Sequence, residues 1–257
     1  MSWESIIDIM DKYGPMYLRG AGVTLLISII GTICGSVIGL LIGTIRTIPM
    51  PEKGIRRIIQ KIINAILSVY VEVFRGTPMI VQAMVIYYGS AIAFGFTNMD
   101  RTLAALFIVS INTGAYSTEI VRGGIISIDK GQFEAAHAIG MNHRKTMIHV
   151  VLPQVIRNIL PAIGNEFIIN IKDTSVLNVI SVSELYFQTK TVAGNTYLSF
   201  EPYFIACVIY LIMTLSVTRI LRLFERKMEG PENFVVIPGN QMQVDRPEDL
   251  VKRAKAK

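Results

Sequence analysis

Two carboxylates, Glu166 and Asp173, interrupt a largely apolar stretch in the second half of the chain. They are seven residues apart, so a continuous helix would carry both on one face, two turns from each other. An ionisable side chain within a bilayer costs about 2.5–3.5 kcal/mol on insertion scales, and it therefore usually faces a bundle interior or a wet cavity. Two carboxylates on such a face suit an ammonium or guanidinium group in a transport pathway.

Structural roles for these two carboxylates stay open on the sequence alone. Asp173 follows Lys172 directly, and this charged pair could simply mark the outer end of a membrane span. Glu166 could instead form an ion pair with Arg75 of its own chain or with Arg157 of a partner subunit. Substrate contact at both carboxylates is therefore a prediction with a structural alternative beside it.

Neutral polar residues in other apolar runs are further candidates for the same pathway. Asn112 could offer hydrogen bonds to a substrate, whereas the hydroxyl of the adjacent Thr113 more often bonds to its own backbone. Thr24 and Ser28, four residues apart in the first apolar run, could line the route, although contact between helices accounts for them better. We add Asn112 and Thr24 to the predicted substrate contacts.

No residue pattern in the chain indicates catalysis or metal binding. The three histidines lie six residues apart and do not share one helix face, and no serine–histidine–aspartate set or pair of acids is convincing. Cys34 and Cys207 both lie in apolar runs, which predicts packing residues rather than a disulfide or a metal pair. A phosphate-binding loop of the form G-x-x-x-x-G-K-[ST] is absent. We expect no cofactor on this chain, and any ATP must be bound by another subunit.

Hydropathy indicates the elements that position these residues. Hydrophobic residues make up 51% of the 257 residues and charged residues only 17%, against about 25% in soluble domains. A helix that crosses a bilayer needs about 20 predominantly apolar residues. We therefore expect an all-α, polytopic membrane protein with about five transmembrane helices. The predicted spans are residues 20–45, a helix from about 55 to 99, and residues 102–118, 146–170 and 202–218.

The second predicted span has an amphipathic beginning. Apolar residues recur at helical spacing over residues 55–74. Thr77 and Pro78 then have the residue types of an N-cap and a first helical turn. We expect one long helix that bends at this point and continues.

Several other spacings predict contacts that hold the helices together. Gly31, Gly35, Gly39 and Gly43 repeat every four residues along the first span, and such a small-residue stripe lets a second helix approach closely. Acidic and basic residues three apart, as in Glu72–Arg75 and Glu119–Arg122, can pair on one helix face. We interpret the stripe and both pairs as structural.

The distribution of positive charge predicts the topology. The 46–61 loop, the 122–149 loop and the tail from residue 219 together hold 18 of the 25 Lys and Arg residues. Because positive charge concentrates in cytoplasmic loops, we place these segments inside, with the N-terminus outside and the C-terminus inside. The predicted organisation is an extracytoplasmic segment (1–19), a transmembrane domain (20–227) with a cytoplasmic loop at 122–149, and a cytoplasmic tail (228–257).

The cytoplasmic loop contains a segment, EAAHAIGMNHRKTMIHVVLP at 134–153, that a soluble partner could bind. Glu134 near a helix start would favour the positive end of the helix dipole, and small Ala135 and Ala136 would keep the helix slim. Gly140 permits a left-handed turn. The alternative is an ordinary loop helix packed on its own chain.

These residues resemble the EAA loop of permease subunits of bacterial ABC importers. Three more blocks are similar to permeases for polar amino acids of the histidine, glutamine and arginine type: FRGTPMIVQ at 74–82, GAYSTEIVRGGIISI at 114–128 and LPAIGNEFIINIKDTSVL at 160–177. The four blocks occur in the family's order and spacing, and the resemblance covers roughly residues 15–225.

The resemblance implies a type I ABC importer permease fold and assigns roles to several residues. The 131–145 helix would dock on a cytoplasmic ATPase and transmit its motion, with Glu134, Ala135, Ala136 and Gly140 as the coupling residues. The NEF and KDTS blocks would line the pathway, which supports Glu166 and Asp173 and adds Thr174 to the predicted substrate contacts.

The resemblance also implies the rest of the machine, which would import a polar, possibly basic amino acid across the bacterial cytoplasmic membrane by alternating access. Its partners would be two ATPase subunits that carry ATP and Mg, a second permease subunit of the same or a related kind, an extracytoplasmic substrate-binding protein and membrane lipid. We expect no nucleic acid partner. A secondary transporter or channel driven by an ion gradient is the alternative that the spans alone leave open.

Overall fold

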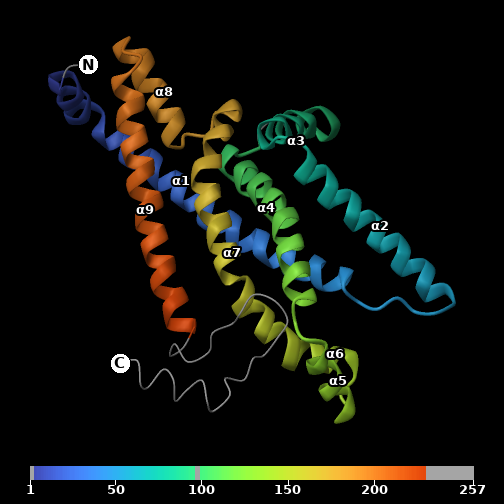
Figure 1. Ribbon diagram of the computed structural model, residues 1–257. Coiled ribbons are helices and arrows are strands. Elements are labelled where there is room, and N and C mark those ends of the chain that lie inside the picture. Colours follow the sequence, from blue (N-terminus) through green and yellow to red (C-terminus); the bar gives the residue numbers. More distant parts are fainter. Residues whose placement is uncertain (1–2, 96–98, 230–257) are drawn as a thin grey trace, which may run out of the picture.

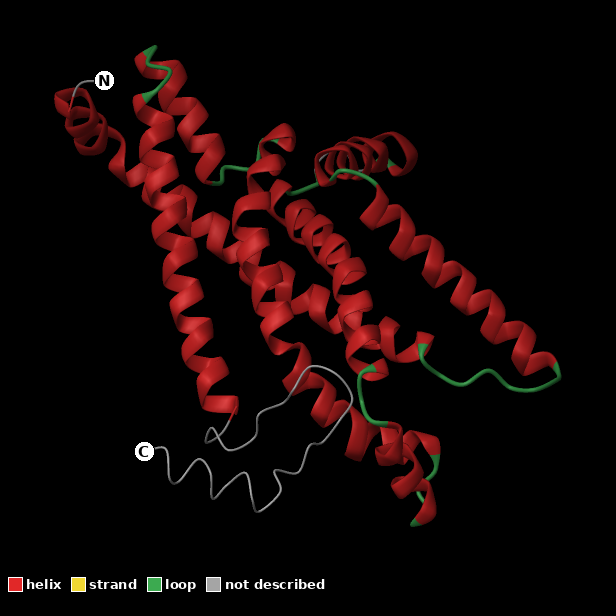
Figure 2. Ribbon diagram, in the orientation of Figure 1, coloured by secondary structure: helices red, strands yellow, loops and turns green. Residues whose placement is uncertain are grey.

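The computed structural model of the chain describes residues 3–95 and 99–229 (Figure 1). These residues form helices joined by short connections, and they contain no strand (Figure 2). Four helical stretches are long and apolar enough to cross a membrane, and a bent helix pair makes five if it counts as one span. The all-α prediction with about five spans is thus confirmed, whereas the sidedness of the termini stays a prediction. The predicted tail lies outside the described residues from position 230 onward.

The longest helix, α1 (Trp3–Arg46), forms the most extensive helix pair of the fold with α4 (Arg101–Ile126). The predicted glycine stripe makes this pair possible, because a Cβ at any of its four positions would overlap α4. The packing prediction for the stripe is confirmed. From Trp3 onward, the N-terminal segment predicted over 1–19 is continuous with the first span. The facing residues on α4 are Val109, Thr113, Ser117 and Val121.

The predicted bend at Thr77–Pro78 is confirmed, but the prediction of one long helix is wrong, because the chain forms two helices, α2 (Ile55–Gly76) and α3 (Met79–Phe94), that meet at 114°. Thr77 has extended backbone angles (φ −123°, ψ 147°), since a residue before proline avoids the helical region. The amide of Gln82 donates to the carbonyl oxygens of Phe74 and Thr77, both at 2.9 Å, and so satisfies backbone groups that the break leaves free.

Helix α2 is amphipathic with its apolar face pointing away from the rest of the chain. Ile58, Ile62 and Ile66 are all more than half exposed, whereas Val71 on the other side is buried. A soluble protein would turn these isoleucines inward. The outward apolar face therefore agrees with a helix that contacts lipid or another membrane subunit.

The second half of the chain is arranged around the helix α7 (Leu152–Asp173). A π-helical turn, Met147–Val151, precedes α7, and a 3₁₀ segment, Thr174–Ile180, follows it. We call the end of the molecule that bears α5 and α6 the coupling end, and the end that bears α3 and α8 the distal end (Figure 1). The remaining helices are α5 (Lys130–Ala138), α6 (His143–Thr146), α8 (Leu185–Thr196) and α9 (Glu201–Glu229).

Candidate functional site

Glu166 and Asp173 lie on the same helix, α7, as their spacing predicts. Glu166 is partly buried, and Asp173 is exposed at the end of the helix. Asp173 repels the charge on Glu166, whereas Arg75 on α2 attracts it. Among the described residues, however, neither carboxylate is within ion-pair distance of a cation. The two carboxylates therefore form an acidic face whose charge the described residues leave without a direct partner.

Arg75 is held at the end of α2 by an aromatic ring. Its guanidinium carbon lies 5.5 Å from the ring centroid of Tyr116 on α4, a cation–π distance. The Glu72–Arg75 pair that the spacing indicated does not occur among the described residues. Arg75 is instead available to act at longer range on Glu166.

A buried amide between the two carboxylates joins α7 to the α1–α4 pair. Asn170 is one turn after Glu166, and its side-chain nitrogen donates to the hydroxyl oxygens of Thr32 at 2.8 Å and Thr113 at 3.0 Å. Only 4% of Asn170 is exposed, so a missing partner would leave a buried polar group unsatisfied. Sequence analysis missed this residue, although an asparagine within an apolar run, on the face of two acids, was a usable signal.

Asn112 does not share the face of the α7 carboxylates but lies against the break between α2 and α3. Its amide nitrogen donates to the side-chain oxygen of Gln82 at 2.9 Å and to the carbonyl oxygen of Phe74 at 3.3 Å. The hydroxyl of Tyr70 donates to the carbonyl of Ile111 at 2.7 Å beside it. The structure thus gives Asn112 a role in holding the break, and substrate contact there stays a prediction.

Thr24 and Thr174 are both fully buried and already hydrogen-bonded. The Thr24 hydroxyl accepts from the backbone N–H of Leu185 at 3.2 Å, which ties α1 to the start of α8. The Thr174 hydroxyl donates to the carbonyl oxygen of Ile171 at 3.1 Å. For Thr24 this geometry supports a role in helix packing.

A second buried carboxylate, Glu184, caps α8 and escaped the sequence analysis. Its oxygens accept from the backbone N–H groups of Tyr186 at 2.8 Å and Phe187 at 2.7 Å, and from the hydroxyl of Tyr210 at 3.2 Å. Burial raises the pKa of the Glu184 carboxyl to about 7, although the three hydrogen bonds act in the opposite direction. Little in the sequence signals this cap, because glutamate is not among the residues that commonly cap helix N-termini.

The loop between α4 and α7, which we call the coupling loop after its predicted role, contains two short helices, α5 and α6. The sequence predicted a single helix over 131–145. Asp129 caps α5 by accepting from the N–H of Gly131 at 2.7 Å, and Asn142 caps α6 by accepting from the N–H of Lys145 at 3.0 Å. Between them Gly140 has φ 82°, which confirms the predicted left-handed turn. This turn ends α5 and prevents one continuous helix.

The predicted coupling residues differ in their exposure to solvent. Glu134, Ala135 and Gly140 are exposed, whereas Ala136 is buried against the chain itself. Ile139, which sequence analysis missed, is 79% exposed next to the turn. An apolar side chain this open, in a loop beside exposed small residues, suits contact with another protein.

The coupling loop is packed onto the beginning of α7. Phe133 of α5 contacts a buried apolar cluster that contains Val121 of α4 and Met147 and Val151 of the π-helical turn. A push on α5 would therefore reach α7 through packed side chains, since close-packed interiors transmit displacement.

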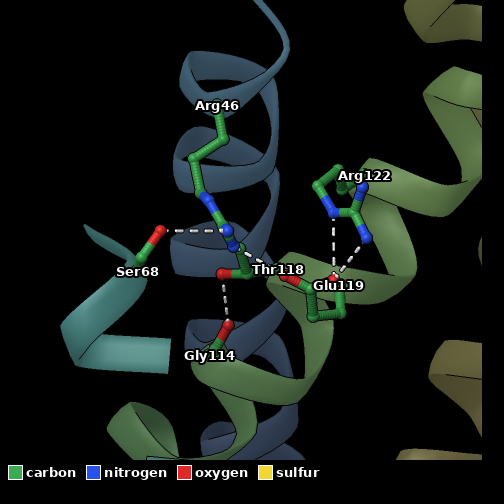
Figure 3. Close-up of polar contacts among 6 residues, drawn as sticks. All are labelled: Arg46, Ser68, Gly114, Thr118, Glu119 and Arg122. Atoms are coloured by element: carbon green, nitrogen blue, oxygen red, sulfur yellow. Dashed lines mark hydrogen bonds and ion pairs between the residues drawn. The ribbon is translucent and has the colours of Figure 1, made fainter. Parts of the chain in front are cut away.

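An ion network joins three helices near the coupling end (Figure 3). Glu119 accepts from Arg122 at 2.8 Å, which confirms the predicted pair, and also from Arg46 of α1 at 2.6 Å. Arg46 donates in addition to the Ser68 hydroxyl of α2 at 3.2 Å. Because Glu119 and Arg46 are only about one-fifth exposed, the network fixes α1, α2 and α4 to one another more firmly than a surface pair would.

The described residues contain no group of three or more His, Cys, Asp or Glu side chains arranged for a metal ion. Cys34 and Cys207 are both free. Both are also exposed, so they do not pack within this chain as the prediction of packing residues implied. An outward position on α1 and α9 suits them because a cysteine is apolar enough to face lipid.

Sequence comparisons place this geometry among transport proteins. Residues 35–230 match the family model described as binding-protein-dependent transport system inner membrane component. The chain is 41% identical over 215 residues to the glutamine transport system permease protein GlnP of Escherichia coli K12, covering 84% of this chain and 94% of that protein. It is 36% identical over 216 residues to the arginine transport system permease protein ArtQ of Bacillus subtilis, with the same coverages.

Solved structures show the same architecture. A crystal structure of an amino acid ABC transporter with histidines matches with 38% identity and a TM-score of 0.76, covering 88% of this chain and 99% of that one. The MetNI methionine ABC transporter in an inward-facing conformation matches with 18% identity and a TM-score of 0.69, covering 89% and 99%. The second likeness, at this low identity, concerns the fold alone, and it is that of a type I importer permease.

Proposed function

We propose that this chain imports a polar amino acid with energy from ATP hydrolysed on a partner subunit. The premise is that the chain belongs to the family of binding-protein-dependent transport system inner membrane components. The family and the named relatives make it an amino acid ABC permease subunit and a multi-pass membrane protein. One structural observation carries the finer proposal. Helix α7 bears the acidic face and is packed at its other end onto an exposed loop suited to a partner.

The substrate class follows from the charges around α7. Glu166 and Asp173 would take the ammonium or guanidinium group of an amino acid, because charge-assisted hydrogen bonds to carboxylates are strong. Arg75, which already attracts Glu166, supplies a positive group for the carboxylate of a zwitterion. The relatives named for glutamine and arginine transport agree with a polar or basic amino acid.

Coupling would occur at the loop that contains α5 and α6. The exposed Glu134, Ala135 and Gly140 would enter a groove of a cytoplasmic ATPase, and Ile139 would add an apolar contact. Buried Ala136 would keep α5 seated on its own chain. ATP and Mg²⁺ would be bound by two such ATPase subunits, with a second permease subunit completing the pathway.

Transport would proceed by alternating access across the bacterial cytoplasmic membrane. Closure of the ATPase pair on ATP would draw the two coupling loops together, and α7 would turn relative to the α1–α4 pair. This turn would expose Glu166 and Asp173 to the extracytoplasmic side, where the binding protein releases substrate. Hydrolysis would reverse the turn and leave the substrate facing the cytoplasm.

Reconstitution in lipid vesicles tests this proposal. The chain, its co-purified ATPase and its binding protein should together take up amino acid only when ATP is present. Uptake by this chain alone in response to an ion gradient would support the secondary transporter or channel instead. Titration of the binding protein with glutamine, arginine and histidine would then identify the substrate.

The role of the loop is tested by exchanging Glu134 for alanine in the same vesicles. Glu134→Ala should leave the chain inserted but weaken ATPase association or the stimulation of ATP hydrolysis by substrate. Glu72→Ala, an exposed glutamate on α2 outside the loop, is the matched control and should behave as the wild type. Normal coupling in Glu134→Ala would contradict the assignment.

A further inference from the structure

A polar cavity of about 530 Å³ is lined by residues at the distal end of the molecule. This end lies far from α5 and α6 (Figure 1). Four segments that are distant in sequence surround it: α1, α3, the beginning of α4 and the loop that precedes α8. Hydroxyl groups of Ser181 and Ser183 and the side chains of Arg19, Asp100 and Arg101 contribute to its lining. The cavity is separate from the acidic face of α7, which none of these residues belongs to.

The cavity presents more positive than negative charge. Arg19 and Arg101 are both exposed, and neither guanidinium group forms a hydrogen bond or an ion pair with another residue that the structure describes. Asp100 is already engaged, because its carboxylate accepts from the backbone N–H of Leu103 at 2.8 Å as the cap of α4. Two guanidinium groups with free donors around one polar hollow are suited to bind a carboxylate.

The loop of residues 181–183, which lines part of the cavity, is held in place by packing and hydrogen bonds. Val182 is 2% exposed and belongs to the apolar cluster that includes Ala104 and Ile108 of α4. Ser181 has φ 59°, and its N–H donates to the carbonyl of Asn178 at 2.9 Å. Buried Glu184 fixes the next turn by capping α8. A site whose shape exists before binding loses less conformational entropy when a partner arrives.

The cavity is also connected to the acidic face. The loop of residues 181–183, which lines the cavity, follows directly on the 3₁₀ segment Thr174–Ile180. The first residue of this segment, Thr174, follows Asp173 in the chain. Leu177 and Ile180 of that segment are buried in the same cluster as Val182. A contact in the cavity would therefore bear on the end of α7 that carries Asp173.

We propose that this cavity is a contact site for the extracytoplasmic binding protein, in which Arg19 and Arg101 receive an acidic side chain of that protein. The inference rests on the proposed function, which supplies the partner and places the distal end outside. Arg19 and Arg101 stand at the outer limits of two uncharged runs, 20–45 and 102–118, where a soluble protein can approach. Docking there would signal to α7 at the moment when substrate is released.

The test is a titration of the reconstituted complex with the binding protein that supports wild-type uptake. The concentration that half-maximally stimulates ATP hydrolysis is measured at low and high salt, because it does not depend on how much complex is assembled. The double variant Arg19→Glu/Arg101→Glu should raise this concentration roughly 10-fold, since it replaces attraction by repulsion. The wild-type value should also rise with salt, because salt screens the attraction, whereas the value of the charge-reversed variant should fall with salt, because salt screens the repulsion.

Three comparisons make the result decisive. Lys190→Glu, an exposed cation on α8 outside the cavity, should titrate as the wild type. Arg19→Lys/Arg101→Lys retains the charge and should recover most of the affinity, and Arg19→Gln/Arg101→Gln serves if the reversed charges prevent insertion. An unchanged titration in the charge variants would overturn the inference while leaving the proposed function intact. An effect that follows the anionic lipid content rather than the binding protein would likewise overturn it, in favour of lipid phosphate.

Discussion

The α1–α4 pair and helix α7 hold the same molecule together by different physical means. Glycines at four-residue spacing bring α1 so close to α4 that a Cβ at any of these positions would overlap the α4 side chain that faces it. Helix α7 also packs on α4 with apolar side chains, but it is joined to both helices of the pair by a hydrogen-bonded amide, and irregular helical turns lie at both of its ends. Side chains packed closely against a stripe of glycines resist sliding, whereas a π-helical turn or a 3₁₀ segment can absorb a change in helix register.

This difference suggests a division of labour within the subunit. The α1–α4 pair, fixed further by the Arg46–Glu119–Arg122 network, would be the frame. Helix α7, with an exposed loop at one end and two carboxylates further along, would be the moving part. The predictions that follow separate changes in transport from changes in stability.

Neutralising the carboxylates should give the largest effect, and it should fall on transport alone. Glu166→Gln/Asp173→Asn should lower the uptake of a cationic amino acid at least ~30-fold, because a desolvated charge partner is worth about 2–5 kcal/mol. Tm in detergent should not fall, since no described residue depends on either carboxylate for an ion pair. Uptake kinetics that stay at wild-type values for several amino acids would assign both residues to structure.

A methyl group in the frame should affect stability instead. Gly39→Ala would place its Cβ against Ser117 of α4, and overpacking of this kind costs about 1–3 kcal/mol. Gly22→Ala, on the same helix with open space around its Cβ, is the matched control and should keep or slightly raise Tm. Equal Tm values for the two variants would show that the glycine stripe is not a close contact.

Titration of Glu184 should make the junction of α1, α8 and α9 at the distal end sensitive to pH. The folded protein holds this proton more tightly than the unfolded chain, because the pKa rises from 4.5 to about 7. Stability should therefore decline by up to ~3 kcal/mol as pH rises from about 4.5 to about 7, and then level off. Thermal melts of Glu184→Gln should lack this decline, whereas melts of Glu72→Gln should retain it. A decline that persists in Glu184→Gln would point to another group.

The hydrogen bond between Asn170 on α7 and Thr113 on α4 should contribute to both stability and transport. Its loss should give the smallest effect of these changes. Thr113→Val removes a hydroxyl that faces Asn170 and should cost about 1 kcal/mol of stability. It should also change the KM for substrate, because α7 would no longer be held at one rotation. Thr113→Ser retains the hydroxyl and should restore KM. A fall in Tm with unchanged KM in the valine variant would make the hydrogen bond purely structural.

Local spacing predicted the features that depend on one helix. The glycine stripe, the shared helix of Glu166 and Asp173 and the left-handed turn at Gly140 are all confirmed, because each follows from the geometry of one segment. The helix start at Thr77–Pro78 was predicted to within one residue, but the size of the break was underestimated, because a proline also keeps the residue before it out of the helical region.

Contacts between helices escaped the sequence because they join residues far apart in the chain. Asn170 and Thr32 are separated by 138 positions, and Leu185 and Thr24 by 161. No local pattern identifies which hydroxyl a buried amide will meet. Arg46, the unpredicted third member of the ion network, is 73 positions from Glu119 and was missed for the same reason.

Pulsed electron paramagnetic resonance on spin-label pairs tests the central claim that α7 moves against a fixed α1–α4 frame. In a background with Cys34 and Cys207 replaced by serine, one pair joins exposed Ile45 of α1 to Ile126 of α4, and the other joins Ile45 to Ile156 of α7. Between the nucleotide-free and ATP-trapped complexes, the α1–α4 distance should stay constant, and the α1–α7 distance should change by more than ~2 Å. A shift of both distances together, or of neither, would contradict the account.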